Sequence, residues 1–310
     1  NEVLDAGVAF ATINYSLLDV PGFNDAEAND TEGLGKSLSD VKEALQYIRH
    51  NAVEFNVDPD KIAMYGVSAG AVSSLWLAYS DDMADTAAGD ALNASESTRI
   101  VAAGAIETQG SMDVVRWEEI LAPIQVTLEI AAGLTLSLME SVYAIEASDA
   151  TTSLALMREE TGDIANFRAT LDLPALIDSE DPAVFVSNTL VSPIDTGIAL
   201  TRLAEIQISA AVLLEELKTV TDSDVAQAKF TELFALQAEG VEIAPGIINA
   251  LLHFPTHASI IMQTAMGVGA EVVANIPELL DENTAAAVNP EALTVIPFLL
   301  QELEDAAQQP

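Results

Sequence analysis

Residues 61–70, Lys-Ile-Ala-Met-Tyr-Gly-Val-Ser-Ala-Gly, constrain the fold more than any other segment. An apolar stretch typical of a buried strand, Ile62–Tyr65, leads directly into a Gly-x-Ser-x-Gly sequence, and a helix without breakers follows over Ala71–Tyr79. We expect a turn too tight for side chains two residues either side of Ser68, which explains Gly66 and Gly70. Such a turn strains Ser68 and exposes its hydroxyl above the sheet, while the N–H of Ala69 points at a developing oxyanion.

Apolar strands and helices alternate around this turn. Because this alternation is typical of a parallel sheet covered on both faces, we expect an α/β fold. The expected strands are Val8–Tyr15, Ile62–Tyr65, Ile100–Ile106, Ala183–Val191 and Glu271–Ile276. The expected helices are Ser37–Phe55, Ala71–Tyr79, Pro255–Met266 and a terminal helix beginning at Asn289-Pro290-Glu291.

Two helical blocks interrupt the alternation. Residues 114–170 and 196–250 are apolar, helical in pattern and poor in breakers. We interpret them as cap insertions over the strand ends, so that residues 1–113, 171–195 and 251–310 form the α/β core. The alternative is a separate helical domain or a partner-binding surface.

The chain of 310 residues is strongly acidic, with 11 basic against 49 acidic residues and a net charge of −38. This excess argues against nucleic acid and anionic membrane surfaces as partners, since both require Lys and Arg. It favours solubility or a salty environment. There is no cysteine, which excludes disulfides and thiolate metal sites. The longest apolar run, near Ile130–Met139, is too short to span a bilayer, so we expect no transmembrane segment.

The chain begins at Asn1 rather than Met, which suggests either a removed signal or pro-segment or a piece of a longer protein. A secreted or periplasmic location is therefore our first expectation, and the cytoplasm of a halophile is the alternative.

Several segments carry a more specific resemblance. Residues 44–79, with Asp-Pro-Asp-Lys-Ile before the Gly-Val-Ser-Ala-Gly turn, resemble α/β-hydrolases of the carboxylesterase and acetyl-esterase/lipase type. Residues 75–98, Glu180-Asp181-Pro182 and His253-Phe254-Pro255 are similar to a bacterial subgroup of predicted hydrolases in that class. The resemblance implies an α/β-hydrolase fold and hydrolysis of a small-molecule carboxylic ester through an acyl-serine intermediate, with no metal or organic cofactor. The same turn also serves lipases, peptidases and thioesterases.

Two departures from that family stand out. Its members place a His-Gly-Gly oxyanion loop before the strand that corresponds to Val8–Tyr15, and this loop and the first strands of the sheet are absent here. Members also carry the catalytic histidine after the last strand, whereas no histidine follows Ile276. One alternative is thus a catalytically inactive binding or assembly subunit. Another is one chain of a cleaved precursor with a companion chain, and a homo-oligomer also stays open.

Few residues of this chain are candidates for a catalytic serine, histidine and carboxylate. Ser68 is the expected nucleophile, and a serine needs a histidine base oriented by a carboxylate. Of the three histidines, His50 precedes the turn on a helix, so His253 is the preferred base and His257 the alternative. Asp195, expected in a loop after the Ala183–Val191 strand, is the preferred acid.

Other acidic residues are weighed against this set. Asp181 is expected to turn the chain into its strand, and Glu107 and Asp113 are expected to line the site. The i, i+4 spacing of His253 and His257 also suits a metal pair, but no third ligand follows nearby, so no metal site is expected.

Overall fold

The computed structural model describes residues 2–20, 33–87, 94–124, 126–145, 150–189, 191, 193–276 and 295–308. The chain divides into two compact units, residues 1–189 with 255–310 and residues 190–254. The larger unit is built around a β-sheet, and the smaller unit consists of two long helices.

A parallel four-stranded sheet organises the larger unit. Its strands are β1 (Ala63–Val67), β2 (Ala102–Ile106), β3 (Ala183–Ser187) and β4 (Val272–Asn275), in spatial order β1-β2-β3-β4. The register aligns the last residues, so that Val67, Ile106, Ser187 and Asn275 lie side by side. The residue that follows each strand therefore stands at one common edge, the carboxyl edge of the sheet.

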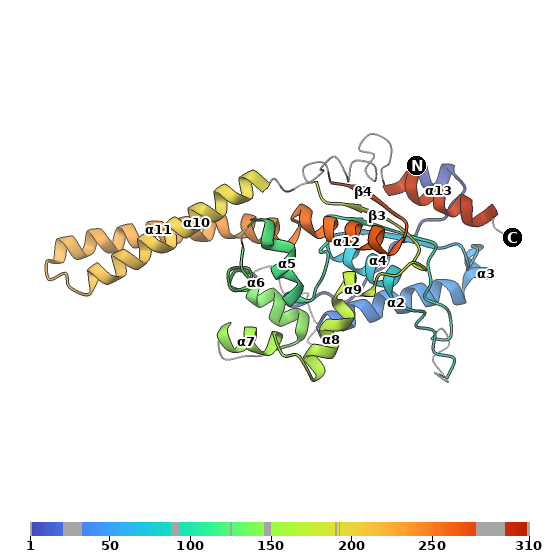
Figure 1. Cartoon of the computed structure of the whole chain (residues 1–310), viewed down its shortest axis with the longest axis horizontal. Helices are drawn as coiled ribbons and strands as arrows, with labels where there is room; N and C mark the ends of the chain where they lie inside the picture. The colour runs from blue at the N-terminus through green and yellow to red at the C-terminus, as the bar shows by residue number, and fades with distance from the viewer. Residues whose placement is uncertain are drawn as a thin grey trace. The chain divides into compact units, whose positions relative to one another are not determined.

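Helices cover both faces of this sheet (Figure 1). The helices α2 (Leu34–His50), α4 (Ala69–Tyr79), α9 (Leu173–Leu176) and α12 (Pro255–Val268) share one buried cluster with alternate strand residues such as Val184 and Val186. On the other face α13 (Val295–Gln308) packs Phe298 against Phe185 of β3, with ring centroids 5.9 Å apart. The expectation of an α/β fold with a parallel sheet and helices on both faces is confirmed.

The remaining elements of this unit are short or peripheral. The N-terminal helix is α1 (Glu2–Asp5), and α3 (Ala52–Phe55) follows α2 after a break at Asn51. The first helical block forms η1 (Val114–Arg116), α5 (Trp117–Leu121), η2 (Ala122–Ile124), α6 (Leu128–Tyr143), α7 (Ala150–Met157) and α8 (Asp163–Leu171). This block belongs to the larger unit.

The expected strand Val8–Tyr15 is wrong, because the described part of this segment has no strand assignment. Its apolar side chains pack instead of pairing: Ile13 and Tyr15 contact the core cluster, and the ring of Phe10 lies 6.3 Å from that of Tyr65. The segment is fastened to α2 at its end, where Ser16 N–H donates to Asp40 at 2.7 Å. The segment is only partly buried, with Phe10 50% exposed, so its apolar composition produced neither a sheet ladder nor full burial.

The expected start of the terminal helix at Asn289-Pro290-Glu291 lies outside the described residues. Whether the first strands of the fold are absent stays a prediction.

The smaller unit contains two helices, α10 (Pro193–Leu217) and α11 (Ser223–Leu252), which run side by side (Figure 1). Each helix buries a seam with alternating spacings of three and four residues, the pattern of a coiled coil. The seam of α10 comprises Thr196, Ala199, Leu203, Ile206, Ala210, Leu213 and Leu217, and that of α11 comprises Ala226, Lys229, Leu233, Leu236, Gly240, Ile243, Ile247 and Ala250. The assignment of residues 196–250 as an active-site cap stays a prediction.

Among the described helices, residues Asp195–Leu217 are long and apolar enough to cross a membrane by length and composition alone. A helix that packs on protein passes the same measure, so the expectation of no transmembrane segment stays a prediction.

Candidate functional site

Ser68 lies between the end of β1 and the start of α4, in a conformation that few residues adopt. Its backbone angles are φ 54° and ψ −116°, and Ala69 is the first residue of the helix. A non-glycine residue at positive φ costs roughly 1–3 kcal/mol and marks a site where surrounding structure enforces the strain. The Ser68 N–H donates to Ile106 O of β2 at 2.9 Å, which fixes the turn to the sheet. The sequence therefore places its serine in the expected strained strand-to-helix turn.

Two glycines make this turn possible in different ways. A Cβ on Gly66 would lie 2.2 Å from the backbone carbon of Gly70, a distance that no packing tolerates. A Cβ on Gly70 would meet nothing within 4 Å. The steric explanation is therefore right for Gly66 and wrong for Gly70, where a side chain has room.

Glu107 follows β2 at the carboxyl edge, as its place in the register requires. Its φ is 51°, its side chain is 3% exposed, and its N–H donates to Ser187 O at 2.6 Å. One carboxylate oxygen accepts a hydrogen bond from Thr189 N–H at 2.8 Å. Glu107 thus lies at the carboxyl edge next to the end of β1, and its place in the lining of the site stays a prediction.

Asn188 is a buried residue at the same edge that sequence reasoning missed. It follows β3, and its amide forms a reciprocal pair with Thr108: Thr108 N–H donates to Asn188 Oδ1, and Asn188 Nδ2 donates to Thr108 O, both at 2.8 Å. The pair holds the chain segments after β2 and β3 together. A polar residue directly after a buried strand was the available signal.

His257, on the first turn of α12, is completely buried. Gly110 N–H donates to its Nδ1 at 3.0 Å, and its ring meets that of Trp117 edge-on with centroids 5.6 Å apart. An Nδ1 that accepts leaves the ring proton of a neutral imidazole on Nε2. A base for a serine needs the opposite arrangement, with Nδ1–H oriented by a carboxylate and Nε2 as acceptor. The hydrogen bond from Gly110 thus counts against His257 as the base.

His253 and Asp195 both belong to the unit formed by residues 190–254. His253 ends α11, and its Nδ1 lies 3.0 Å from Asn249 O. Asp195 is exposed in the first turn of α10, so the expectation that it lies in a loop is wrong. Their approach to Ser68, in the other unit, stays a prediction.

His50 ends α2 with its Nδ1 3.2 Å from a carboxylate oxygen of Glu96. Its ring is partly exposed, and this surface ion pair agrees with its exclusion as the base.

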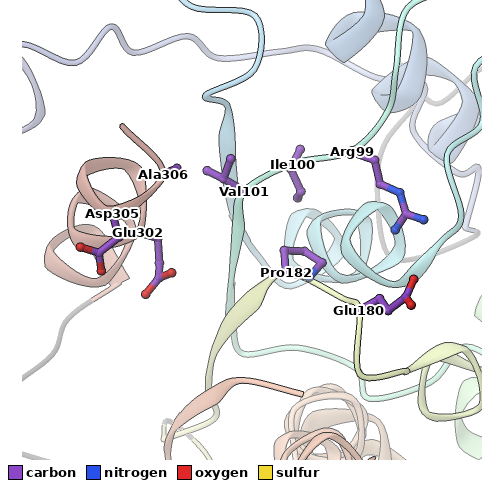
Figure 2. Close-up of a pocket in the computed structure, with 8 residues that line it drawn as sticks. All are labelled: Arg99, Ile100, Val101, Glu180, Pro182, Glu302, Asp305 and Ala306. Carbon is purple, nitrogen blue, oxygen red and sulfur yellow. The ribbon is translucent and has the colours of Figure 1, made fainter. Parts of the chain in front are cut away.

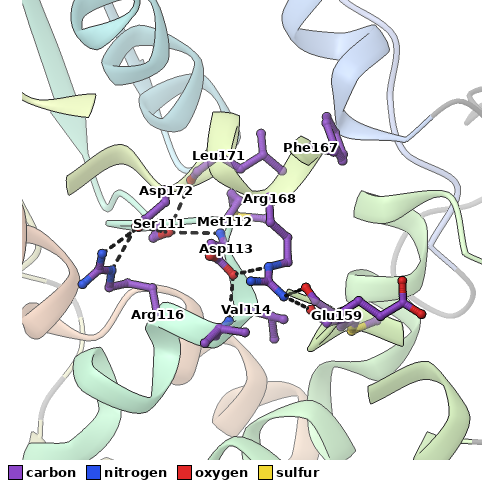
Figure 3. A network of polar contacts seen from close by, with 12 residues as sticks. Ser111, Met112, Asp113, Val114, Arg116, Glu159, Phe167, Arg168, Leu171 and Asp172 are labelled. Carbon is purple, nitrogen blue, oxygen red and sulfur yellow. Dashed lines mark hydrogen bonds and ion pairs between the residues drawn. The ribbon is translucent and has the colours of Figure 1, made fainter. Parts of the chain in front are cut away.

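Asp113 belongs to a polar network that connects the segment after β2 to α8 and α9 (Figure 3). Arg168 Nε lies 3.0 Å from one carboxylate oxygen of Asp113, and that oxygen also accepts from Val115 N–H at 2.9 Å. Burial raises the pKa of the Asp113 carboxyl above its usual range, against the opposing effects of that backbone hydrogen bond and of Arg168. Arg116 pairs with Asp172 in the same network through two hydrogen bonds of 3.0 and 2.6 Å. These contacts give Asp113 a structural role, and its place in the lining of the site stays a prediction.

A cavity of about 480 Å³ opens at the opposite, amino edge of the sheet (Figure 2). Its lining includes Arg99, Glu180, Glu302 and Asp305. Burial, with Glu271 and Asp305 nearby, raises the pKa of Glu302. Ligands of open parallel sheets bind at the carboxyl edge, so this cavity is separate from the Ser68 site. Among the described residues, no group of three or more His, Cys, Asp or Glu is arranged to hold a metal ion.

Comparison with known families supports the resemblance drawn from the sequence. Residues 1–142 match the model of the BD-FAE family, an α/β-hydrolase-like esterase domain. This stretch contains β1, the Ser68 turn and β2, so the resemblance of the chain to α/β-hydrolase esterases is confirmed over its first 142 residues. No curated protein matches the chain.

Two solved structures are similar to this chain at low identity. The acetyl ester-xyloside bifunctional hydrolase from Caldicellulosiruptor lactoaceticus is 16% identical, with a TM-score of 0.34 over 50% of this chain. The match spans 44% of that hydrolase, less than half of its length. A truncated form of a carbohydrate esterase from gut microbiota is 12% identical, with a TM-score of 0.44 over 98% of this chain and 77% of its own. These values are too low to transfer an activity.

Proposed function

We propose that this protein hydrolyses a small, uncharged carboxylic ester with Ser68 as the nucleophile. The single observation that carries the proposal is the strained conformation of Ser68, with φ 54° between β1 and α4. Strain of this kind persists where a function requires it. The match of residues 1–142 to an esterase family supports the same reaction class.

In this mechanism the Ser68 hydroxyl oxygen attacks the ester carbonyl carbon while a base takes the hydroxyl proton. The carbonyl oxygen becomes an oxyanion, for which the Ala69 N–H at the start of α4 is a suitable donor. The base then passes its proton to the departing alcohol, and an acyl-serine forms. Water, deprotonated by the same base, releases the acid and restores Ser68.

His253 remains our preferred base and Asp195 our preferred acid, with His257 as the alternative base. The proposal for His257 requires that its ring exchange the Gly110 hydrogen bond for a carboxylate partner. The net charge of −38 repels anionic substrates and therefore favours a neutral ester.

The test is labelling with a fluorophosphonate, which reacts with activated serines, followed by mass measurement of the intact chain. We expect one adduct on the native protein and none on Ser68→Ala. Ser80→Ala is the matched control, because Ser80 ends the same helix α4 at its other terminus. Equal labelling of native protein and Ser68→Ala, or no labelling of folded native protein, contradicts the proposal.

The base is assigned by separate His253→Ala and His257→Ala variants, assayed with p-nitrophenyl acetate. Loss of the base lowers kcat by about 10²–10⁴-fold, and added imidazole restores part of the rate. Imidazole rescue distinguishes a missing base from a disturbed fold. Full activity in both variants removes both histidines from the mechanism.

A second candidate function is a non-catalytic binding or assembly subunit that keeps the turn for structural reasons. The observation that favours it is the hydrogen bond from Gly110 N–H to His257 Nδ1. His257 lies in the same unit as Ser68, and this hydrogen bond occupies the nitrogen that would have to donate to a carboxylate if His257 were the base. Absence of a Ser68-dependent adduct, on protein with native circular dichroism, decides for this candidate.

A further inference from the structure

The hairpin formed by α10 and α11 carries its ion pairs on one side. Arg202 pairs with Glu239 across the two helices at 2.6 Å and with Glu205 along α10 at 3.0 Å. Lys229 pairs with Glu216 across the helices at 2.5 Å. At about 100° per residue, Arg202, Glu205, Glu216 and Glu239 flank the buried seam on one side, which we name the charged face, and Lys229 reaches Glu216 from the seam itself.

The opposite flank of the seam carries no ionised side chain among the described residues of the two helices. It is the uncharged face, and it comprises Ala204, Gln207, Ala211 and Leu214 of α10 and Phe230, Phe234, Gln237 and Val241 of α11. The side chains of Phe234 and Val241 are 65% and 74% exposed. Ile198, Ile208 and Val212 of α10 are also exposed but lie outside this face, where the described part of α11 has no matching series. The exposed apolar residues Phe230, Phe234 and Val241 follow helical spacing on the uncharged face of α11, which in a chain of net charge −38 indicates a binding surface.

The two helices contribute side chains of different size to this face. The ion pairs between Arg202 and Glu239 and between Glu216 and Lys229 fix the axial alignment of the hairpin. By this alignment Ala204 lies level with Val241, and Ala211 lies level with Phe234. These two levels of the uncharged face therefore have a small residue on α10 and a larger one on α11, whereas Gln207 lies level with Gln237 and Leu214 with Phe230.

This arrangement is self-complementary. A two-fold axis that runs parallel to the helices, between two hairpins placed face to face, keeps every level and exchanges the two helices. It sets Phe234 against the partner's Ala211 and Val241 against the partner's Ala204, so that large side chains enter the gaps above small ones.

The size of the face suits such a pairing. At 1.5 Å per residue α10 is about 38 Å long, and two helices packed about 10 Å apart present roughly 750 Å². A stable interface buries about 800 Å² per partner.

The charges of the unit argue against lipid as the occupant. Residues 190–254 contain nine acidic and three basic residues. Helices that lie in a membrane interface carry Lys and Arg beside their apolar face, which anchor them to headgroups. We propose that the uncharged face of the α10–α11 hairpin binds the same face of a second copy of this chain, forming an antiparallel four-helix bundle.

The test is sedimentation velocity of the full chain from roughly 1 to 100 µM, the range that resolves a micromolar dissociation constant. About 0.5 M NaCl screens the repulsion between acidic chains. The wild type shifts from one chain to two as concentration rises. Ala211→Glu and Phe234→Glu raise the dissociation constant by about tenfold or more, since a carboxylate at the centre of the interface loses its water.

Ser209→Glu is the matched control, because it adds the same charge to α10 two residues from Ala211, on the side of the charged face. It leaves the dissociation constant within about twofold. Circular dichroism confirms that all variants keep their helices.

A wild type that stays monomeric at every concentration overturns the proposal, and so does a dimer that all three variants weaken equally or leave intact. A monomer that floats with neutral phosphatidylcholine vesicles assigns the face to lipid instead. Because the assay measures association alone, its result is independent of the ester hydrolysis proposed for Ser68.

Discussion

The Ser68 turn and the α10–α11 hairpin are stabilised by opposite means. The turn depends on residues far apart in the sequence: Ser68 N–H bonds to Ile106 O, and the neighbouring strand edge is held by Asn188. Its serine has a strained backbone, and a Cβ on Gly66 would overlap Gly70. The hairpin has a regular seam of local origin, and its glycine Gly240 has room for a methyl group. A site that holds one side chain in one geometry needs contacts between residues far apart in the sequence. A surface that repeats along a helix needs only a regular seam between neighbouring helices.

The largest expected difference between the two regions is their response to one added methyl group, first in the Ser68 turn. Gly66→Ala places a carbon 2.2 Å from the Gly70 backbone, and neither strand nor helix is free to move, so we expect a loss of about 3 kcal/mol in the free energy of unfolding. Chemical denaturation measures it. Gly70→Ala is the control, because its Cβ position is open. Equal losses in the two variants refute the steric account of the turn.

Truncation of a side chain in the hairpin seam is expected to destabilise the hairpin alone. Leu233 is 5% exposed in the seam of α11, and Leu233→Ala removes most of that contact, at a cost of about 2 kcal/mol. Amide hydrogen exchange of α10 and α11 should rise by roughly thirtyfold, while the amides of α4 keep their rates. The nearby exposed residue Ala235 provides a matched site, where Ala235→Ser should change little. Faster exchange in α4 contradicts the local character of the hairpin.

The same methyl addition that damages the turn is expected to help the hairpin. A Cβ on Gly240 lies 3.7 Å from Ile206 Cγ2, an ordinary contact, and alanine is the better helix former by about 0.8 kcal/mol. Gly240→Ala should slow the exchange of hairpin amides by about fourfold. A destabilised hairpin would mean that its helices pack more tightly than the seam geometry indicates.

The smallest expected effect concerns pH. Burial raises the pKa of Asp181 to about 6, and Asp178 raises it further against the lowering effect of the Asp178 backbone N–H. Since the folded pKa exceeds the unfolded one, the folded state binds more protons, and stability falls as pH rises from about 4 to 6. Asp181→Asn removes this loss.

Because Asp181 is partly exposed and solvent screens its charge, we expect a gain below about 1 kcal/mol at pH 7 and none at pH 4. Thermal unfolding at the two pH values measures it, and an equal gain at both excludes titration of Asp181 as the cause.

Local sequence patterns were sufficient for most elements and for the strained turn at Ser68. The strands around Ile62–Tyr65 and Ile100–Ile106 are apolar runs bounded by turn residues, a pattern that full burial requires in β2 and that the edge strand β1 keeps although Tyr65 and Val67 are exposed. The same reasoning failed at Val8–Tyr15, because an apolar extended segment can pack against a core without a neighbouring strand. An apolar pattern by itself reports neither how deeply a segment is buried nor whether it has a hydrogen-bonded partner strand.

The sequence by itself determined the α/β alternation, the serine between two glycines and the acidic surface, because each follows from residues close together along the chain. Only the tertiary structure decided which acid stands beside the Ser68 strand, since Glu107 reaches that place through the register of β1 and β2. It also decided the tautomer of His257, through a backbone N–H 147 residues away. Strand register and hydrogen-bond direction are properties of neighbours in space, and a linear pattern contains neither.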